Sequence, residues 1–142
     1  MELYAGSRMM HRGLDIDVPW GSTVRAIDDG EVGFISRDPK EMYLTVMHGG
    51  GVSAMYYHLG DIIVAERQRI RRGEVLGYTG PTGYSSPARD QMVGYPHLHL
   101  EVYRDGDRVD PAKLKMTCPD QLGRYWWPVA CESFHRKSAQ GR

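Results

Sequence analysis

The sequence predicts a mostly β protein with a small antiparallel sheet or sandwich core, groove-forming loops and little helix. Two observations support this prediction. Glycine (17 residues) and proline (8 residues) punctuate the first three quarters of the chain, and runs of β-branched and aromatic residues lie between them. In addition, residues 1–110 show no apolar period of 3.6 residues over two turns, as an amphipathic helix would require. Many short antiparallel strands satisfy both observations.

The expected strands follow one another at short intervals. They are residues 23–27, 31–36, 42–48, 52–58, 74–78 and 97–103. The glycine triplet at 49–51 joins the third run to the fourth, which is typical of a β-hairpin. Residues 84–96 form a long loop before the last run, and loops of this length in a compact domain are often functional.

The residue composition changes after Pro111, and residues 112–142 show no clear apolar period. We therefore expect two parts, a domain at residues 1–111 and a C-terminal appendage at 112–142 that is partly helical or loose. Cys118 and Cys131 both lie in the appendage. In an exported protein they can form a disulfide, whereas in a reducing cytosol they would remain thiols.

The charge balance indicates which partners to expect. Lysine plus arginine and aspartate plus glutamate each number 18, so nothing calls for nucleic acid or an anionic membrane. No stretch approaches ~18 consecutive apolar residues, so we expect no transmembrane segment. The N-terminus lacks the basic start and apolar run of a signal peptide. We expect that the chain reaches its compartment in another way or is excised from a longer protein, and that it is a monomer.

The pair His97 and His99 is the first candidate for chemistry. Side chains two residues apart in a strand project from the same face, so both imidazoles would point one way while Leu98 and Leu100 point to the core. Two imidazoles aimed at one spot suit a metal site. A His-x-His pair on its own, however, is more often two surface histidines on an edge strand.

A second cluster strengthens the metal hypothesis. His11 and Asp15 place an imidazole and a carboxylate four residues apart. Catalytic zinc typically takes three such protein ligands and leaves a fourth position for water. His11, Asp15 and either His97 or His99 would complete that set. Asp17 is a nearby alternative carboxylate, although a solvated loop residue is the simpler interpretation.

The other histidines carry weaker signals. His48 and His58, each taken alone, are best interpreted as structural residues. His135 lies in the appendage with the two cysteines, and their spacing matches no strong zinc pattern.

Three motifs together resemble the lysostaphin-type (LytM-like) zinc metalloendopeptidases that hydrolyse peptidoglycan. The family signature is His-x-Gly-x-Asp, then Tyr-x-His-Leu, then Pro-His-Leu-His. Here these motifs correspond to residues 11–15, 56–59 and 96–99, within a resemblance that runs from about Ser7 to Pro111. One departure is an insertion at residues 87–95 before the last motif, which we expect to rim the groove and to affect substrate preference.

The resemblance implies a role for each residue. His11, Asp15 and His99 would be the ligands of one catalytic zinc ion, and His58 and His97 would be catalytic groups beside its open position. The implied activity is hydrolysis of peptide cross-links or stem peptides of bacterial peptidoglycan by zinc-activated water, with the two histidines assisting. The partners would be peptidoglycan peptides, and the location would be periplasmic, cell-surface or secreted.

Three alternatives remain. A non-catalytic relative would bind peptidoglycan or activate an amidase, but such copies typically lose zinc ligands, and all three are present here. A zinc peptidase with a substrate outside the cell wall is compatible with the motifs. A carrier domain of the biotinyl/lipoyl or sugar-phosphotransferase kind would need a lysine at an exposed hairpin tip, and the candidate Lys115 lies outside the hairpin region.

Overall fold

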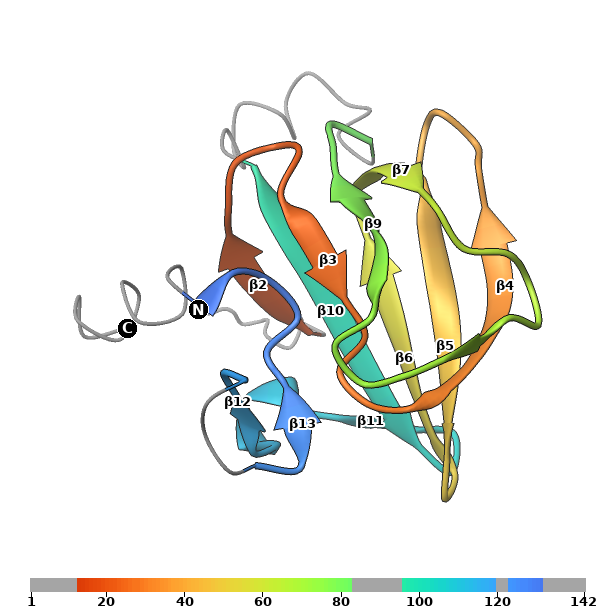
Figure 1. Ribbon diagram of the computed structural model, residues 1–142, viewed down its shortest axis with the longest axis vertical. Helices are drawn as coiled ribbons and strands as arrows, with labels where there is room; N and C mark the ends of the chain where they lie inside the picture. The colour runs from red at the N-terminus through yellow and green to blue at the C-terminus, as the bar shows by residue number, and fades with distance from the viewer. Residues whose placement is uncertain (1–12, 83–95, 120–122, 132–142) are drawn as a thin grey trace.

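Two antiparallel sheets make up the body of the protein, and a short strand pair lies beside them (Figure 1). The computed structural model describes residues 13–82, 96–119 and 123–131. Among these residues the large sheet has seven strands, in the order β11-β10-β6-β5-β4-β8 with β2 also paired to β10. Its strands are β2 (Leu14–Asp17), β4 (Gly30–Ser36), β5 (Tyr43–Gly49), β6 (Val52–Tyr57), β8 (Arg69–Ile70), β10 (His97–Arg104) and β11 (Asp107–Val109).

The described part of the small sheet has three strands in the order β3-β9-β7. They are β3 (Thr23–Arg25), β7 (Leu59–Ile62) and β9 (Val75–Thr79). The 3₁₀ turn η1 (Pro111–Lys113) then leads to the parallel pair β12 (Met116–Thr117) and β13 (Tyr125–Trp126). The predicted mostly β class with antiparallel sheets is confirmed. No helix among the described residues is long and apolar enough to cross a membrane.

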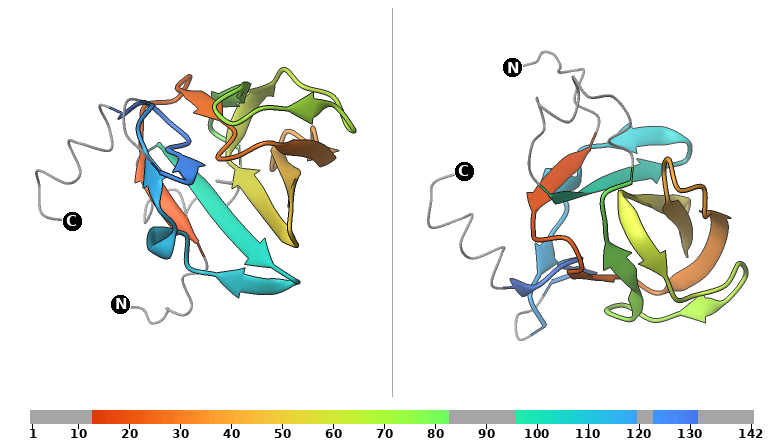
Figure 2. Two further views of the ribbon diagram at one scale, coloured as in Figure 1. Left: turned by 60° about the horizontal axis from the view of Figure 1, so that its bottom comes forward. Right: turned by 90° about the horizontal axis from the view of Figure 1, so that it is seen from above.

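The hydrophobic core lies between the two sheets, which face each other in Figures 1 and 2. It forms because alternate side chains of each strand are apolar and turn to the same side. The fully buried members include Val24 and Leu76 from the small sheet and Leu44, Tyr56 and Leu100 from the large one. The opposite face of the large sheet carries the polar and aromatic side chains that build the candidate site.

The predicted hairpin around the glycine triplet is present. β5 and β6 pair with Leu44 opposite Tyr56 and Val46 opposite Ala54. All three glycines have positive φ angles, of 81°, 61° and 79°. Because side chains disfavour this region of backbone space, the tight connection depends on glycine.

Strand β2 differs from the sequence-based expectation. None of the runs that the sequence predicts as strands includes residues 14–17, whereas Leu14–Asp17 is a strand that pairs antiparallel with the first half of β10. The run is too short to show a clear alternation of apolar and polar residues. Its conformation is set by hydrogen bonding to a partner more than 80 positions away, and no local pattern reports such pairing.

The segment after Pro111 packs against the core. Met116, Tyr125, Trp127 and Val129 are buried members of the hydrophobic cluster. Two backbone hydrogen bonds fasten it to the small-sheet region, from Arg25 N–H to Pro128 O and from Trp126 N–H to Ile27 O, both 2.8 Å long. The division of the chain at residue 111 stays a prediction.

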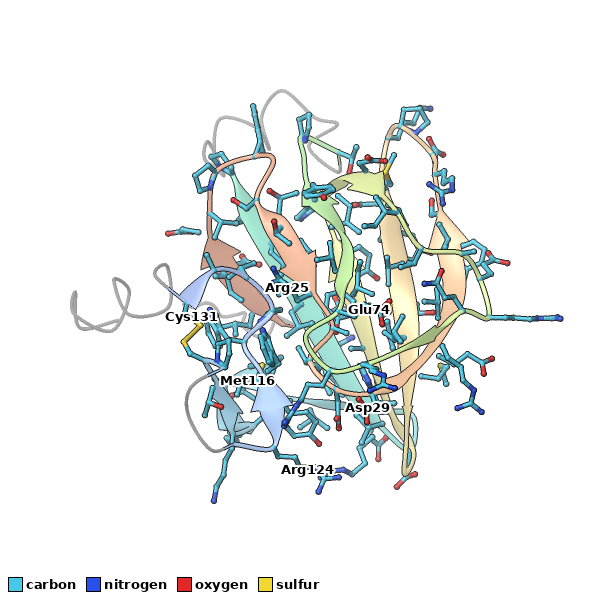
Figure 3. All side chains as sticks on the ribbon, viewed as in Figure 1. Arg25, Asp29, Glu74, Met116, Arg124 and Cys131 are labelled. Atoms are coloured by element: carbon cyan, nitrogen blue, oxygen red, sulfur yellow. A yellow bond between two sulfur atoms is a disulfide. The ribbon has the colours of Figure 1, made fainter. Side chains whose placement is uncertain are left out.

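A disulfide links Cys118, the residue after β12, to Cys131, the last described residue. Figure 3 shows it beside the label of Cys131, next to the β12–β13 pair. The sequence left open whether these cysteines pair. Disulfides of this kind form and persist in oxidising compartments such as the periplasm and the extracellular space.

Tyr56 joins β6 to the connection between β3 and β4 through a buried hydrogen bond, and its removal should destabilise the fold. The side chain is completely buried, and its hydroxyl oxygen accepts a hydrogen bond of 3.0 Å from the N–H of Ile27. Tyr56→Phe would leave that N–H without its acceptor in the core, so we expect a loss of about 1–3 kcal/mol in the free energy of unfolding, measured by urea denaturation. Tyr57→Phe is the control, because the Tyr57 hydroxyl donates to the thioether of Met55, a weak acceptor. If the two variants unfolded at the same urea concentration, this interpretation of Tyr56 would be wrong.

Candidate metal and catalytic site

The site begins at the first residue of β10. The predicted alternation is present: Leu98 and Leu100 are completely buried in the core, whereas His97 and His99 belong to the opposite face. His97 is nevertheless only 3% exposed, and the ring of His58 lies 4.8 Å from its own ring between centroids. The two imidazoles therefore emerge from a rigid element rather than from a loop, which fixes their separation.

Strand β2 brings Asp15 to these histidines. In the antiparallel register Asp15 stands directly opposite His99, although 84 positions separate them in the sequence. The Asp15 Oδ1 atom lies 2.5 Å from His99 Nδ1 and 3.8 Å from His97 Nε2. One carboxylate oxygen thus lies beside a nitrogen of each imidazole.

Gly13 allows β2 to approach β10 this closely. A Cβ atom at position 13 would overlap the carbonyl oxygen of Leu100 and lie 3.0 Å from His99 Cε1. Gly13→Ala should therefore push the start of β2 away from β10, with a cost of about 1–3 kcal/mol in stability. We also expect weaker zinc binding, which competition with a chromophoric chelator would measure.

The matched control for Gly13 is Gly50→Ala. Gly50 has a φ angle of 61°, but a Cβ there would meet nothing within 4 Å. This change strains the backbone and leaves the candidate site alone. Equal zinc affinities for the two alanine variants would contradict the role given to Gly13.

The second nitrogen of His99 faces another carboxylate. His99 Nε2 lies 3.0 Å from Glu101 Oε2. Burial lowers the pKa of the His99 imidazole, but the hydrogen bonds with Asp15 and Glu101 outweigh this effect and raise the pKa to about 9. Burial likewise opposes ionisation of Glu101, and its hydrogen bonds with His99 and Tyr103 still hold its pKa below the ordinary value. The His99 imidazole therefore lies between two carboxylates that both favour its protonated form.

His58 follows β6 and faces the same place. Its ring centroid lies 4.8 Å from that of His97 and 6.1 Å from that of His99. Its backbone has a φ angle of 66°, which is uncommon for a residue other than glycine and recurs at functional sites. This turn aims the imidazole at the two histidines of β10.

The loop after β9 orients His58. The carbonyl oxygen of Thr82 lies 3.0 Å from His58 Nδ1. Thr82 is itself held by its hydroxyl group, which donates to Leu59 O at 2.7 Å and accepts from Met42 N–H at 3.0 Å. Because a carbonyl only accepts, this contact places a proton on Nδ1, and neutral His58 then carries its lone pair on Nε2.

Aromatic side chains continue the site across the large sheet. The Tyr57 ring lies 5.6 Å from the His99 ring and 4.9 Å from the Tyr43 ring, measured between centroids. Tyr43 lies 5.9 Å from Phe34, whose side chain is 56% exposed. The histidine cluster therefore adjoins an open aromatic surface on β6, β5 and β4.

The other sequence candidates divide into two groups. His11, the loop at 84–95 and His135 lie outside the described residues. His48 lies at the far end of β5, where its Nδ1 is 2.9 Å from the carbonyl oxygen of Asp29 and burial lowers its pKa. This contact agrees with the structural interpretation of His48. Asp17 stands opposite His97 in the β2–β10 register.

Two residues of the site escaped the sequence analysis. Glu101 could have been found, because it lies two residues after His99 and strand alternation places it on the same face. Thr82 could not have been found as a partner of His58, because it acts through a backbone carbonyl, which every residue possesses.

The described side chains fit part of a zinc site. An imidazole and a carboxylate are donors that zinc accepts, and they converge here from two paired strands. Among residues 13–82, 96–119 and 123–131, no group of three histidine, cysteine or acidic side chains is arranged to hold a metal ion. The third predicted ligand, His11, lies beyond that part of the chain.

Known proteins resemble this chain in sequence and in fold. The DD-carboxypeptidase/endopeptidase Mpg of Neisseria meningitidis serogroup B is 35% identical over 114 residues, which cover 78% of this chain and 24% of that protein. A zinc-containing peptidase from Vibrio cholerae is 30% identical with a TM-score of 0.63, over 75% of this chain and 31% of the other. The catalytic domain of lysostaphin from Staphylococcus simulans is 25% identical with a TM-score of 0.59, over 72% and 77% of the two chains.

The family assignment rests on the length of the match. The chain spans about a quarter of the Neisseria relative. Residues 9–111, which contain all three motifs, match the peptidase family M23. The resemblance to lysostaphin-type enzymes is confirmed, and the chain belongs to peptidase family M23.

Proposed function

We propose that this chain is a zinc-dependent endopeptidase that hydrolyses peptide bonds of bacterial peptidoglycan. The observation that carries the proposal is the convergence of Asp15, His97, His99 and His58 from β2, β10 and the end of β6. The relative from Neisseria carries carboxypeptidase and endopeptidase in its name, and the Vibrio structure is that of a zinc-containing peptidase.

In this proposal His11, Asp15 and His99 hold the metal. Asp15 and His99 already face each other across the β2–β10 pairing. When bound, zinc would supply a water molecule that ionises near neutral pH and would polarise the scissile carbonyl group. Because His99 must lose its proton to bind zinc, metal binding should weaken in acid.

His58 and His97 handle protons in the proposed reaction. With its Nδ1 proton directed to Thr82, neutral His58 has its basic nitrogen at Nε2, as a general base requires. His97 is almost completely buried and lies 4.8 Å from His58 between ring centroids. It is therefore the second group able to exchange a proton with the substrate or to hold its developing charge.

The disulfide supports the proposed location. A Cys118–Cys131 bond persists where thiols are oxidised, as in the periplasm or outside the cell, and peptidoglycan lies in those compartments.

Mass spectrometry of fragments released from purified peptidoglycan sacculi tests this function. The wild-type protein should release fragments that end at a cleaved peptide bond, and the fragments identify that bond. The same protein with a chelator, and the His99→Ala variant, should release none. A wild-type protein that holds zinc yet releases nothing from sacculi of several wall types would contradict the cell-wall substrate.

A further inference from the structure

We propose that Glu101, Tyr103 and Arg108 form a positioning chain that sets the orientation and the tautomer of His99 for metal binding. This inference rests on the proposed zinc site. It concerns residues that neither touch the substrate nor bind the metal in that proposal. They act through the ring nitrogen of His99 that faces away from Asp15.

Three hydrogen bonds connect the chain. Glu101 Oε2 lies 3.0 Å from His99 Nε2. The Tyr103 hydroxyl donates to the other carboxylate oxygen, Glu101 Oε1, at 2.8 Å. Arg108 Nη2 donates to the Tyr103 hydroxyl at 3.2 Å, and its guanidinium carbon lies 5.5 Å from the centre of the Tyr103 ring.

The backbone keeps these groups in line. His99, Glu101 and Tyr103 are alternate residues of β10, so they lie along one face of one strand. Arg108 belongs to β11 and stands directly opposite Tyr103 in the antiparallel register. The chain therefore depends on two paired strands rather than on a loop.

The direction of each hydrogen bond follows from chemistry. A guanidinium group can only donate, so the Tyr103 hydroxyl accepts from Arg108 and directs its own proton to Glu101. An ionised carboxylate can only accept, so the proton between Glu101 and His99 belongs to Nε2. If a metal ion took the place of the proton on Nδ1, the nitrogen that lies 2.5 Å from Asp15, the ring would keep its other proton on Nε2, directed to Glu101.

This arrangement favours metal binding in two ways. First, the His99 nitrogen that can bind a metal is the one beside Asp15. Second, the hydrogen bond to Glu101 prevents the imidazole ring from rotating about its Cβ–Cγ bond. Partners of this kind typically change metal affinity by about 10- to 100-fold. Tyr103 contributes by fixing the rotation of the Glu101 carboxylate, because each of its two oxygens then has its own donor.

The test is zinc affinity of the full chain, measured by competition with a chromophoric chelator. We expect Glu101→Ala to weaken zinc binding by about 10- to 100-fold. Glu101→Gln should recover part of the loss, because an amide oxygen also accepts from Nε2. Tyr103→Phe should weaken binding by about 10-fold, at the lower end of that range. Arg108→Gln should have a smaller effect, and the neighbouring exposed Arg104→Gln, the matched control, should have none.

A second measurement reports the tautomer directly. In zinc-loaded protein labelled with ¹⁵N, two-bond proton–nitrogen correlations should show His99 protonated at Nε2, and Glu101→Ala should broaden or lose that proton signal through exchange with water. Circular dichroism would confirm that each variant is folded. Tyr103→Phe removes only a hydroxyl group, so it keeps the test decisive if Glu101→Ala unfolds.

The two proposals fail in different ways. If the wild-type chain binds no zinc, the proposed function is wrong. If the wild type binds zinc and the folded Glu101 and Tyr103 variants bind it equally well, with an unchanged Nε2 proton signal, the positioning chain is wrong and the proposed function stands.

Discussion

Asp15→Asn is expected to remove zinc from the protein and to lower peptide hydrolysis by about 10³-fold or more. The amide has nearly the same size as the carboxylate, so β2 should still pair with β10 at this position. It lacks the negative charge that makes carboxylate oxygen a good zinc ligand. Catalytic zinc contributes several kcal/mol to stabilisation of the transition state, and each 1.4 kcal/mol corresponds to a tenfold change in rate.

The measurements for Asp15→Asn are zinc content by elemental analysis and fragment release from sacculi. Asp17→Asn is the matched control, because Asp17 lies on the same strand and stands opposite His97 rather than His99. The sequence alone left Asp17 as an alternative carboxylate. Loss of zinc from Asp17→Asn, with zinc retained by Asp15→Asn, would reverse the assignment.

His58→Ala should separate metal binding from catalysis. We expect this variant to keep its zinc and to lose about 10²- to 10⁴-fold in kcat, the usual contribution of a positioned acid or base. KM should change much less, since His58 is proposed to transfer protons rather than to hold the substrate. Steady-state kinetics on a soluble cross-linked peptide, together with zinc analysis, would provide the three quantities.

His97→Ala completes the comparison. If the two histidines act in one proton-transfer unit, the double variant should be little slower than the slower single variant, because groups that act together are not additive. His48→Asn serves as a control for the general loss of an imidazole, since asparagine can still donate to the carbonyl of Asp29. A His58→Ala enzyme with zinc and near wild-type kcat would remove His58 from the mechanism.

The sequence predicted the long strands well because their signals are local. Residues 42–48 and 52–58 are runs suited to strands on either side of a glycine triplet, and β5 and β6 begin and end within one residue of those bounds. The alternation at 97–103 also placed His97 and His99 on one face, and β10 confirms it. Such features depend on residues that are neighbours in the sequence.

Features that depend on contacts between residues far apart in the sequence could not be predicted. The pairing of β2 with β10 and the contact of Thr82 with His58 join segments far apart in the sequence. The motifs identified the family, whereas the directions of the hydrogen bonds around His99 required coordinates.

The pairing of β2 with β10 links metal occupancy to local opening of the protein. β2 has four residues, and its described ladder partner is β10. A metal ion held by Asp15 and His99 would join the two strands at the middle of this short ladder, so opening β2 would also require giving up the ion. Zinc should therefore slow amide hydrogen exchange in β2 far more than in the central hairpin of β5 and β6. Low zinc would then favour a protein with an intact core and an open edge at the catalytic site.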